Sequence, residues 1–227
     1  MNRAYFLGIA FAAISCSGDS AASHSPSQET TNQVQTAAAG IPQLLDSLLL
    51  YKSEAELRSV FGDNNVKFDT AWGPEGTNWL CTYLYQGTPD EVQITWHNEA
   101  ERSDMLMLKI SGGIVNDQPV SYKGRWKVKA GILPGLTLAQ LEKLNGKPFT
   151  FSGFGWDYGG GVAGWEGGKL DKSGISVLLR ESPLIYEFME QTELARVLGD
   201  QQVSSSEPVL EKMKVQVQEV MLTAEMK

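Results

Sequence analysis

A glycine-rich, aromatic segment is where the sequence most invites a binding site. Residues 149–170 hold eight glycines and six aromatic side chains. Aromatic faces on tight turns can stack against sugars, peptides or a partner chain, and glycine lets a backbone approach closely. The same pattern fits a twisted strand pair whose rings fill the core, and the alternation of the rings favours this second interpretation. The candidate binding residues are Phe154, Trp156, Asp157, Tyr158 and Trp165.

Two carboxylates flank this segment and provide an enzymatic alternative. Asp157 and Glu166 could face each other as a general acid and a general base, which is the pairing used by many hydrolases. Their separation in space decides whether such chemistry is feasible. A hydrolase that uses these carboxylates is therefore the alternative to a binding function.

Other reactive residue types have structural interpretations. Cys81 lies in an alternating segment, far in sequence from His24 and His97, and is predicted to be a small buried strand residue rather than a catalytic thiol. His97 opens an acidic run that ends at Asp104, but one imidazole with flexible carboxylates makes a poor zinc site. A solvated hairpin turn is predicted there. No catalytic residue, metal or cofactor is assigned.

Charge and motif searches argue against nucleotide or nucleic-acid binding. The chain has 19 basic and 27 acidic residues, and its net charge of −8 repels phosphate backbones. The sequence after Gly153 has Tyr158 where a dinucleotide loop needs its third glycine, and no P-loop is present. No Gly-x-Ser-x-Gly nucleophile motif occurs either. Nucleic acid is therefore not an expected partner.

The N-terminus has the features of an export signal. Arg3 gives a positive start, and residues 4–14 form an uncharged run that is too short for a membrane-spanning helix of about 20 residues. The sequence Ala13-Ile14-Ser15-Cys16 then resembles the lipobox of bacterial lipoprotein signal peptides. This resemblance implies that residues 1–15 are a removable signal peptide. It also implies that Cys16 carries the lipid at the start of the mature chain.

The stretch after the cysteine has the composition of a tether. Residues 17–40 are rich in Ser, Ala, Thr and Gln, contain no aromatic side chain, and offer too little apolar surface to offset the entropy of ordering. Residues 16–40 are therefore expected to link a lipid anchor flexibly to a folded body. Ser17 stands where an inner-membrane retention signal has aspartate, so the lipoprotein resemblance implies the outer membrane.

The folded part contains an internal repeat at an offset of 84 residues. Residues 53–62 match residues 137–146 at several positions. Each copy starts with Ser or Thr, has Glu56 or Gln140 three residues later, and ends in glycine. This spacing predicts a short helix with an N-terminal capping box and a left-handed glycine at its C-terminus.

Extended, alternating segments follow each predicted helix. They cover residues 66–72, 79–85, 92–97 and 105–110 in the first copy, and residues 149–156, 162–170, 175–180 and 215–223 in the second. Residues 183–198 have a mixed pattern and are left unassigned. The economical architecture is an α+β fold of two tandem modules, residues 41–118 and 119–227. Each module has a short helix packed on an antiparallel sheet of about four strands.

One part of the second copy resembles a module of uncharacterised bacterial lipoproteins. In that module Gly-Ile-x-x-Gly-x-[Ser/Thr] leads into a short helix that ends Asn-Gly-x-Pro, as residues 131–137 and 145–148 do here. A helix followed by a meander with this start is distantly similar to SmpA/OmlA domains and to modules of the β-lactamase-inhibitor protein. The resemblance covers about residues 125–180. It implies protein binding through a sheet face, by analogy of fold.

These observations predict a lipid-anchored, non-enzymatic protein of the bacterial cell envelope. Its six tryptophans would suit protein recognition if several share an exposed sheet face. The expected partners are the membrane, through the N-terminal lipid, and another envelope protein or ligand on the aromatic surface. The alternative is a lipid-anchored hydrolase that uses Asp157 and Glu166.

Overall fold

The computed structural model describes residues 43–115, 118–119 and 121–224. The predicted signal peptide, Cys16, His24 and the tether lie outside the described residues. The described part of the chain belongs to one compact unit. Its fold is α+β, with mainly antiparallel sheets and short helices.

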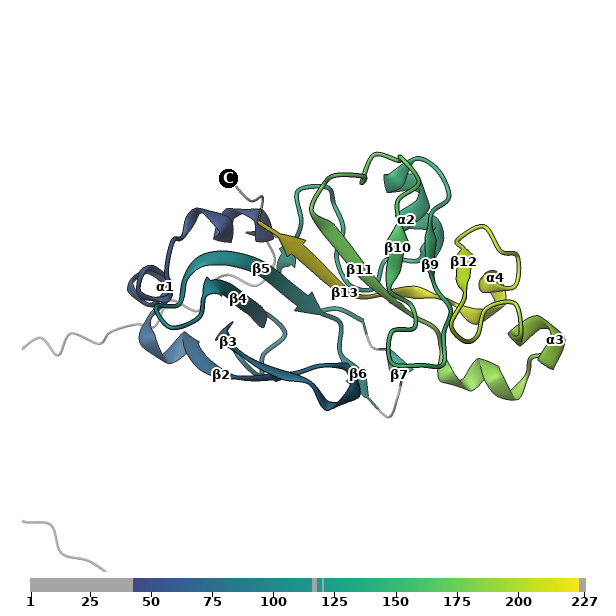
Figure 1. Ribbon diagram of the computed structural model, residues 1–227, viewed down its shortest axis with the longest axis horizontal. Helices are drawn as coiled ribbons and strands as arrows, with labels where there is room; N and C mark the ends of the chain where they lie inside the picture. Colours follow the sequence, from purple (N-terminus) through teal and green to yellow (C-terminus); the bar gives the residue numbers. More distant parts are fainter. Residues whose placement is uncertain (1–42, 116–117, 120, 225–227) are drawn as a thin grey trace, which may run out of the picture. The chain divides into compact units, whose positions relative to one another are not determined.

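Short helices alternate with strands along the chain (Figure 1). The α-helices are α1 (Glu54–Phe61), α2 (Leu138–Asn145), α3 (Gln191–Leu194) and α4 (Leu210–Met213), and the 3-10 helices are η1 (Leu45–Leu50), η2 (Asp63–Asn65), η3 (Pro74–Gly76) and η4 (Pro183–Glu187). The strands are β1 (Gln43–Leu44), β2 (Val66–Trp72), β3 (Asn78–Leu84), β4 (Val92–Asn98), β5 (Ser103–Ser111), β6 (Ile114–Val115), β7 (Gln118–Pro119), β8 (Trp126–Lys127), β9 (Thr150–Ser152), β10 (Val162–Gly164), β11 (Ile175–Arg180), β12 (Gln202–Ser204) and β13 (Gln216–Thr223).

A six-stranded antiparallel sheet forms the centre of the fold, in the order β11-β13-β5-β4-β3-β2. The four strands predicted for the first module are confirmed, with boundaries shifted by at most two residues. The expectation of a separate sheet in each module is wrong. Strand β13 pairs with β5, which sets Val220 opposite Ile110 and Leu222 opposite Leu108 (Figure 1). Both strands bury these apolar side chains, so pairing them extends one core across both halves.

A smaller sheet, in the order β10-β9-β12, packs beside the large one. The strands predicted at residues 149–156 and 162–170 are much shorter than expected, because the chain turns at Gly153 and Gly155 takes a φ of +84°. Gly160 links the two sheets: its N–H donates to the Ser152 carbonyl at 2.7 Å, and its carbonyl accepts from the Leu179 N–H at 2.8 Å. A Cβ on Gly160 would lie 2.1 Å from the Leu179 carbonyl oxygen, so only glycine fits.

The predicted helix caps are confirmed in α2 and only partly in α1. Thr137 and Gln140 form the full capping box of α2, and Gly146 ends that helix in the left-handed conformation. In α1 the Ser53 side chain accepts from the Glu56 N–H, but the Glu56 carboxylate accepts from Lys52 instead of completing the box. Ser53 forms a β-bridge with a residue of β5, which places its backbone in extended pairing.

A buried carboxylate fixes α1 to the sheet. Glu54, only 3% exposed, lies 2.8 Å from Arg58 Nε and 3.1 Å from Arg102 Nε. Its second oxygen accepts from Thr82 Oγ1 at 2.7 Å, and that hydroxyl accepts from Trp96 Nε1 at 2.8 Å. The hydrogen bond that Arg58 donates to the Glu54 carboxylate is the main reason that the pKa of Arg58 is raised. Helix α1, strands β3 and β4 and the β4–β5 turn are thereby held in one polar network.

Candidate binding groove

Two of the predicted binding residues belong to the core. Phe154 and Trp165 are 2% and 8% exposed, and their rings lie 5.2 Å and 5.1 Å from those of Phe151 and Phe149. Trp165 Nε1 also donates to the Ile175 carbonyl at 3.0 Å. Their prediction as ligand contacts is therefore corrected: the core interpretation of these rings holds, because each is enclosed by other side chains.

The other three predicted residues lie together on an exposed turn, residues 156–158, which we call the aromatic turn. Trp156 and Tyr158 are 38% and 47% exposed, and their rings meet edge to face at 5.3 Å. Trp156 Nε1 donates to the Gly153 carbonyl at 2.8 Å, which holds the indole against its own turn. Asp157 is exposed and makes no hydrogen bond or ion pair with any described residue.

The structure does not join Asp157 to Glu166. Glu166 adopts a φ of +53°, its carboxylate accepts from Thr150 Oγ1 at 2.8 Å, and its backbone carbonyl accepts from Lys147 Nζ. Thus Glu166 is hydrogen-bonded to strand β9, while Asp157 is exposed to solvent on the aromatic turn. Nothing in this geometry assembles a general acid and a general base.

The Asn-Gly motif at the end of α2 has a structural role. The Asn145 side chain, 1% exposed, donates to the carbonyls of Lys147 and Trp165 at 2.9 and 3.0 Å and accepts from the Leu170 N–H at 3.2 Å. A Cβ on Gly168 would lie 2.1 Å from its amide oxygen. The asparagine therefore connects the end of the helix to the glycine-rich segment, and Gly168 allows this close approach.

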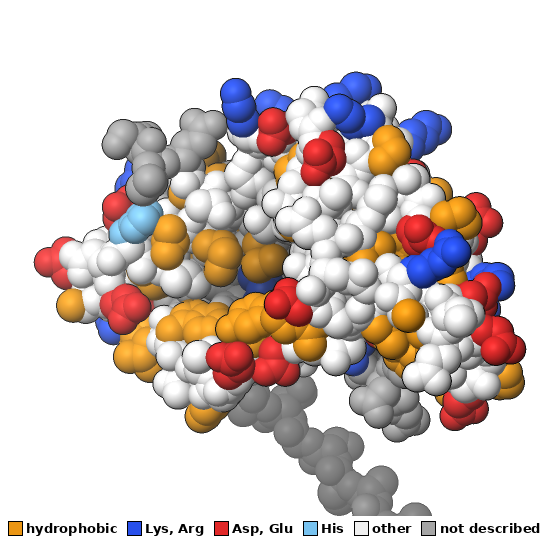
Figure 2. Space-filling model, turned by 45° about the vertical axis from the view of Figure 1, so that its right-hand side comes forward, with side chains coloured by type: hydrophobic (Ala, Val, Ile, Leu, Met, Phe, Trp, Pro, Cys, Tyr) orange, Lys and Arg blue, Asp and Glu red, His pale blue; other side chains and the backbone are white. Residues whose placement is uncertain are grey.

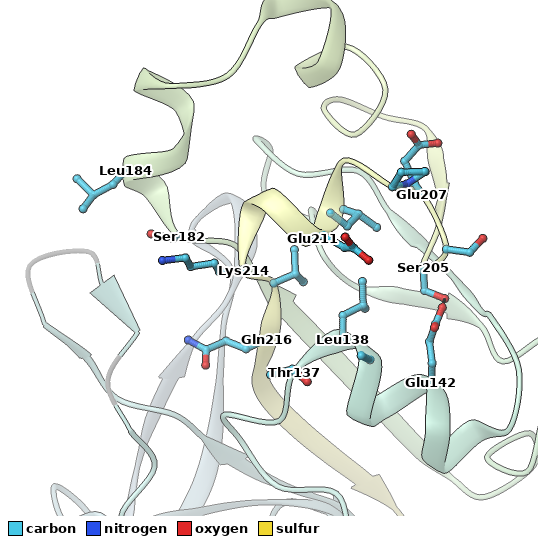
Figure 3. A pocket seen from close by; sticks show the side chains of 15 residues that line it. Thr137, Leu138, Glu142, Ser182, Leu184, Ser205, Glu207, Glu211, Lys214 and Gln216 are labelled. Atoms are coloured by element: carbon cyan, nitrogen blue, oxygen red, sulfur yellow. Dashed lines mark hydrogen bonds between the residues drawn. The ribbon is translucent and has the colours of Figure 1, made fainter.

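A surface groove with a volume of about 950 Å³, here called the helix groove, lies between α2, α4 and η4 (Figure 3). Figure 3 shows Ser205 and Glu142 pointing toward each other on one wall. Ser205 donates to the Glu142 carboxylate and accepts from the Phe149 N–H at 2.9 Å. On the same side, Glu207 pairs with Arg196 at 3.2 Å. These groups already satisfy one another, so this wall gives a ligand little to pair with.

The second groove has about 700 Å³ and lies on the face of the six-stranded sheet opposite the core. We call it the sheet groove. Strands β3, β4 and β5 form its floor, and Trp72 together with the turns at residues 87–91, 111–113 and 121–123 forms its walls. Figure 2 shows hydrophobic side chains gathered around a hollow on the left of the view, where strands β2 to β5 lie. Its volume is in the range of small-ligand pockets.

Gln93 on the floor of the sheet groove has an unusual environment. The residue is 5% exposed, yet its side-chain amide makes no hydrogen bond with any described residue, and its Nε2 atom is fully buried. Two residues further along β4, on the same face, the buried Thr95 hydroxyl is also without a partner. Leaving a buried donor unpaired costs about 1–3 kcal/mol. Such a cost is typical of a position kept for an external partner.

The cation on the floor of the sheet groove has an acidic partner. Lys109 Nζ lies 3.5 Å from Glu219 Oε1, and that same oxygen accepts from Ser111 Oγ at 3.1 Å. Glu91 accepts from the Gly87 N–H at 2.7 Å. The floor therefore offers hydrogen-bonding groups with little uncompensated charge, which suits a polar, neutral ligand better than an ion.

An ion pair positions the two turns at one end of the sheet groove. Asp90 Oδ2 lies 2.9 Å from Arg125 Nη2, and its other oxygen accepts from the Arg125 N–H at 2.8 Å. The Asp90 carbonyl also accepts from Trp126 Nε1 at 2.9 Å. Because Trp126 belongs to the core, this contact fixes the wall turns to the body of the protein.

Cys81 lies beside this face, and its thiol is unreactive. The thiol is fully buried, and burial raises its pKa to about 11, against a smaller opposite effect of its hydrogen bond with Tyr83. A thiol that stays protonated at neutral pH is a poor nucleophile. The prediction of a structural strand residue is confirmed.

No sequence pattern indicated that Trp72, Gln93 and Lys109 line a common groove. One signal was present, since Gln93 stands between Val92 and Ile94 in a predicted strand and must face away from them. Alternation alone assigns such a residue to solvent. Its burial depends on turns that are distant in sequence, which the pattern does not show.

The run from His97 to Asp104 forms the β4–β5 turn, as predicted, with the Glu101 N–H donating to Asn98. The described residues include no cluster of three side chains arranged to hold a metal. In the same part of the chain, no helix has the length and apolar character needed to cross a membrane. Comparisons with protein-family models, with curated proteins and with solved structures found no match.

Proposed function

We propose that this protein is a non-enzymatic binding protein, held on the bacterial envelope by a lipid on Cys16, and that its ligand occupies the sheet groove. The observation that carries the proposal is Gln93, a buried amide on the floor of an open groove that has no hydrogen-bond partner among the described residues. Trp72, which is 69% exposed, supplies an aromatic surface on the wall beside it. Exposed aromatic residues dominate the energy of many recognition surfaces.

The anchor part of the proposal rests on the sequence. The uncharged run before Cys16 and the serine after it support a lipoprotein of the outer membrane. A Cys16→Ser variant is expected to move from the membrane fraction to the soluble fraction of the envelope. Retention of that variant in membranes would contradict the lipid anchor, but it would not bear on the proposed binding site in the sheet groove.

We also propose that the chain arose by duplication of a helix-plus-sheet module. Helices α1 and α2 are each followed by antiparallel strands. Strands β2 to β5 form a meander in the large sheet, whereas β9 and β10 belong to the small sheet and β11 and β13 to the large one. Strands β5 and β13, which end the two sets, are antiparallel neighbours. A two-fold rotation between copies would bring identical final strands together in this way.

No observation favours the hydrolase, since Asp157 and Glu166 have separate roles and Cys81 is protonated and buried. The aromatic turn is the competing surface for a binding function. It is exposed, but its polar group Trp156 Nε1 is already paired.

Two matched tryptophan variants distinguish the surfaces. The full chain, carrying Trp72→Ala or Trp156→Ala, is used to capture material from envelope extracts. The expected result is that Trp72→Ala loses capture, while Trp156→Ala retains it, with both melting temperatures within about 2–4 °C of wild type. The reverse pattern would move the site to the aromatic turn. Capture that survives both substitutions would contradict the proposed function.

A further inference from the structure

The sheet groove presents groups that act as both donor and acceptor. The Gln93 amide can donate and accept, and rotation about its last side-chain bond presents either atom to the groove. The Ser111 hydroxyl at the groove wall donates to Glu219 and can still accept a hydrogen bond from a ligand. Sugar hydroxyls are matched partners, because each of them also donates and accepts.

The aromatic groups of the groove complement a different part of the same ligand. Trp72 is largely exposed, and Tyr83 on the floor is half-buried. A pyranose ring has an apolar face of C–H groups and a rim of hydroxyls. Such a ring can place its apolar face on an indole or phenol while its rim reaches amide and hydroxyl groups.

The electrostatics of the groove argue against an anionic ligand. The Lys109 cation is compensated by Glu219, Glu91 lies on the same groove, and Lys123 is exposed at the rim. The whole chain carries a net charge of −8, which repels polyanions at long range. A neutral polar ligand meets no such barrier.

An extended peptide is less suited to this surface. Peptides that add to a sheet do so at an edge, where backbone groups are free. On the floor of the groove Tyr83 pairs with Gln93 and Gln93 with Lys109, so the backbone groups of these central strands belong to the ladder. A peptide lying across them would have to satisfy its own amides with a few side chains.

We infer, building on the proposed function, that the sheet groove binds a neutral oligosaccharide chain. The sugar rings stack on Trp72 and Tyr83, and their hydroxyls pair with Gln93 and Ser111. The groove is open at the surface, which allows a chain to extend beyond its approximately 700 Å³.

The test is a titration of the isotope-labelled full chain, followed by NMR at the Gln93 side-chain amide and the Trp72 indole. The probes are maltotetraose, tetra-N-acetylchitotetraose, tetra-alanine and inorganic phosphate. We expect at least one oligosaccharide to shift both signals, and the peptide and phosphate to shift neither. Gln93→Met and Trp72→Ala should each weaken saccharide binding by about tenfold, which corresponds to about 1.4 kcal/mol. Trp156→Ala should leave it unchanged.

The inference fails if the peptide or phosphate shifts the groove signals and the sugars do not, or if no probe shifts them. In either case, loss of envelope capture by Trp72→Ala would still support the groove as the binding site, with a ligand of another class. Equal weakening by Trp72→Ala and Trp156→Ala would also overturn the inference, because the sugar would then not be held in the groove.

Discussion

At the scale of single residues, burial decides which groups near the sheet groove can react and which can only bind. Cys81 and Tyr83 lie on the same strand, and burial raises the pKa of both side chains. Gln93, on the next strand, is buried, and its amide pairs with no residue in the described part of the chain. The first two groups are thus kept neutral, while the third retains unused hydrogen-bonding capacity.

The raised pKa of Cys81 predicts a loss of stability at alkaline pH. Between its ordinary value of 9.0 and about 11, the thiol is ionised in the unfolded chain but protonated in the folded protein. Raising the pH across this window therefore lowers the free energy of unfolding, by up to about 1.4 kcal/mol per pH unit. Urea unfolding at about pH 8.5 and about pH 10.5 should show a steeper loss in wild type than in Cys81→Ala.

The comparison removes the contribution of Tyr122, whose pKa is raised by burial in both proteins. Part of the rise in the pKa of Tyr83 comes from Cys81 itself, so that part is lost together with the thiol. Equal pH slopes for wild type and Cys81→Ala would show that the thiol does not carry the effect.

The unpaired amide predicts a substitution that stabilises the fold and weakens binding. Gln93→Met keeps the shape and removes a buried polar group, so the free energy of unfolding should rise by about 1 kcal/mol. Gln218 is the matched control: it is also 5% exposed, but its Nε2 donates to the Gly112 carbonyl at 2.6 Å. Gln218→Met should therefore lower the free energy of unfolding by about 1–2 kcal/mol. Urea denaturation measures both, and a destabilised Gln93→Met would argue for an internal partner.

The sequence predicted single residues well where the local pattern determines their environment. Cys81 lies in an alternating segment that predicts a strand, and it forms a buried residue of β3 as that pattern indicates. Phe154 and Trp165 do not differ in pattern from Trp156, yet only Trp156 is exposed. The difference arises from side chains of other segments that cover the first two, and no local period contains this information.

At the scale of elements, α1 is attached to the sheet mainly by the polar network at its start, because it buries little apolar surface of its own. The helix has eight residues, of which Leu57 is the fully buried apolar one. Glu54 connects it instead to β3, β4 and the following turn.

Removing that carboxylate should be costly. In Glu54→Gln the guanidinium groups of Arg58 and Arg102 lose their partner, but both are about a third exposed and can be hydrated. We expect a loss of about 2–3 kcal/mol in the free energy of unfolding, at the low end for a broken buried pair. Glu56→Gln, at an exposed position in the same turn, should cost less than about 1 kcal/mol. Equal costs, measured by urea unfolding, would contradict a special role for Glu54.

Elements were predictable where capping residues and alternation agree. Both α-helices with cap signals form, and strand β11 has the predicted bounds. The strand expected at residues 149–156 fails because glycine positions within it require turns. The unassigned residues 183–198 contain η4 and α3, which have no side-chain cap that a sequence pattern could reveal.

At the scale of the whole molecule, the pairing of β5 with β13 was beyond the reach of the sequence. Residues Ser111 and Glu219, paired across these strands, lie 108 positions apart. The repeat predicted a capped helix in each half, and α1 and α2 form, but an alternating pattern does not specify which strand edge meets which. The large sheet therefore contains strands of both halves, where a separate sheet was expected in each.

The pairing of β5 with β13 predicts that residues 41–118 do not fold alone. A chain of residues 41–118 would expose the edge of β5 and the apolar surface that β13 covers. We expect poorly dispersed NMR amide signals and aggregation, while residues 41–227 give a dispersed spectrum and a single unfolding transition. A dispersed spectrum from the shorter chain would show that the halves are independent.

The position of β13 also bears on when the protein can complete its fold. It is the last described strand to be synthesised, yet it lies inside the sheet between β11 and β5. Until it arrives, β5 has an open edge and β11 has no neighbour in the large sheet. A chain still on the ribosome therefore cannot complete the large sheet until β13 has been synthesised, and a product that lacks β13 should be degraded by quality-control proteases.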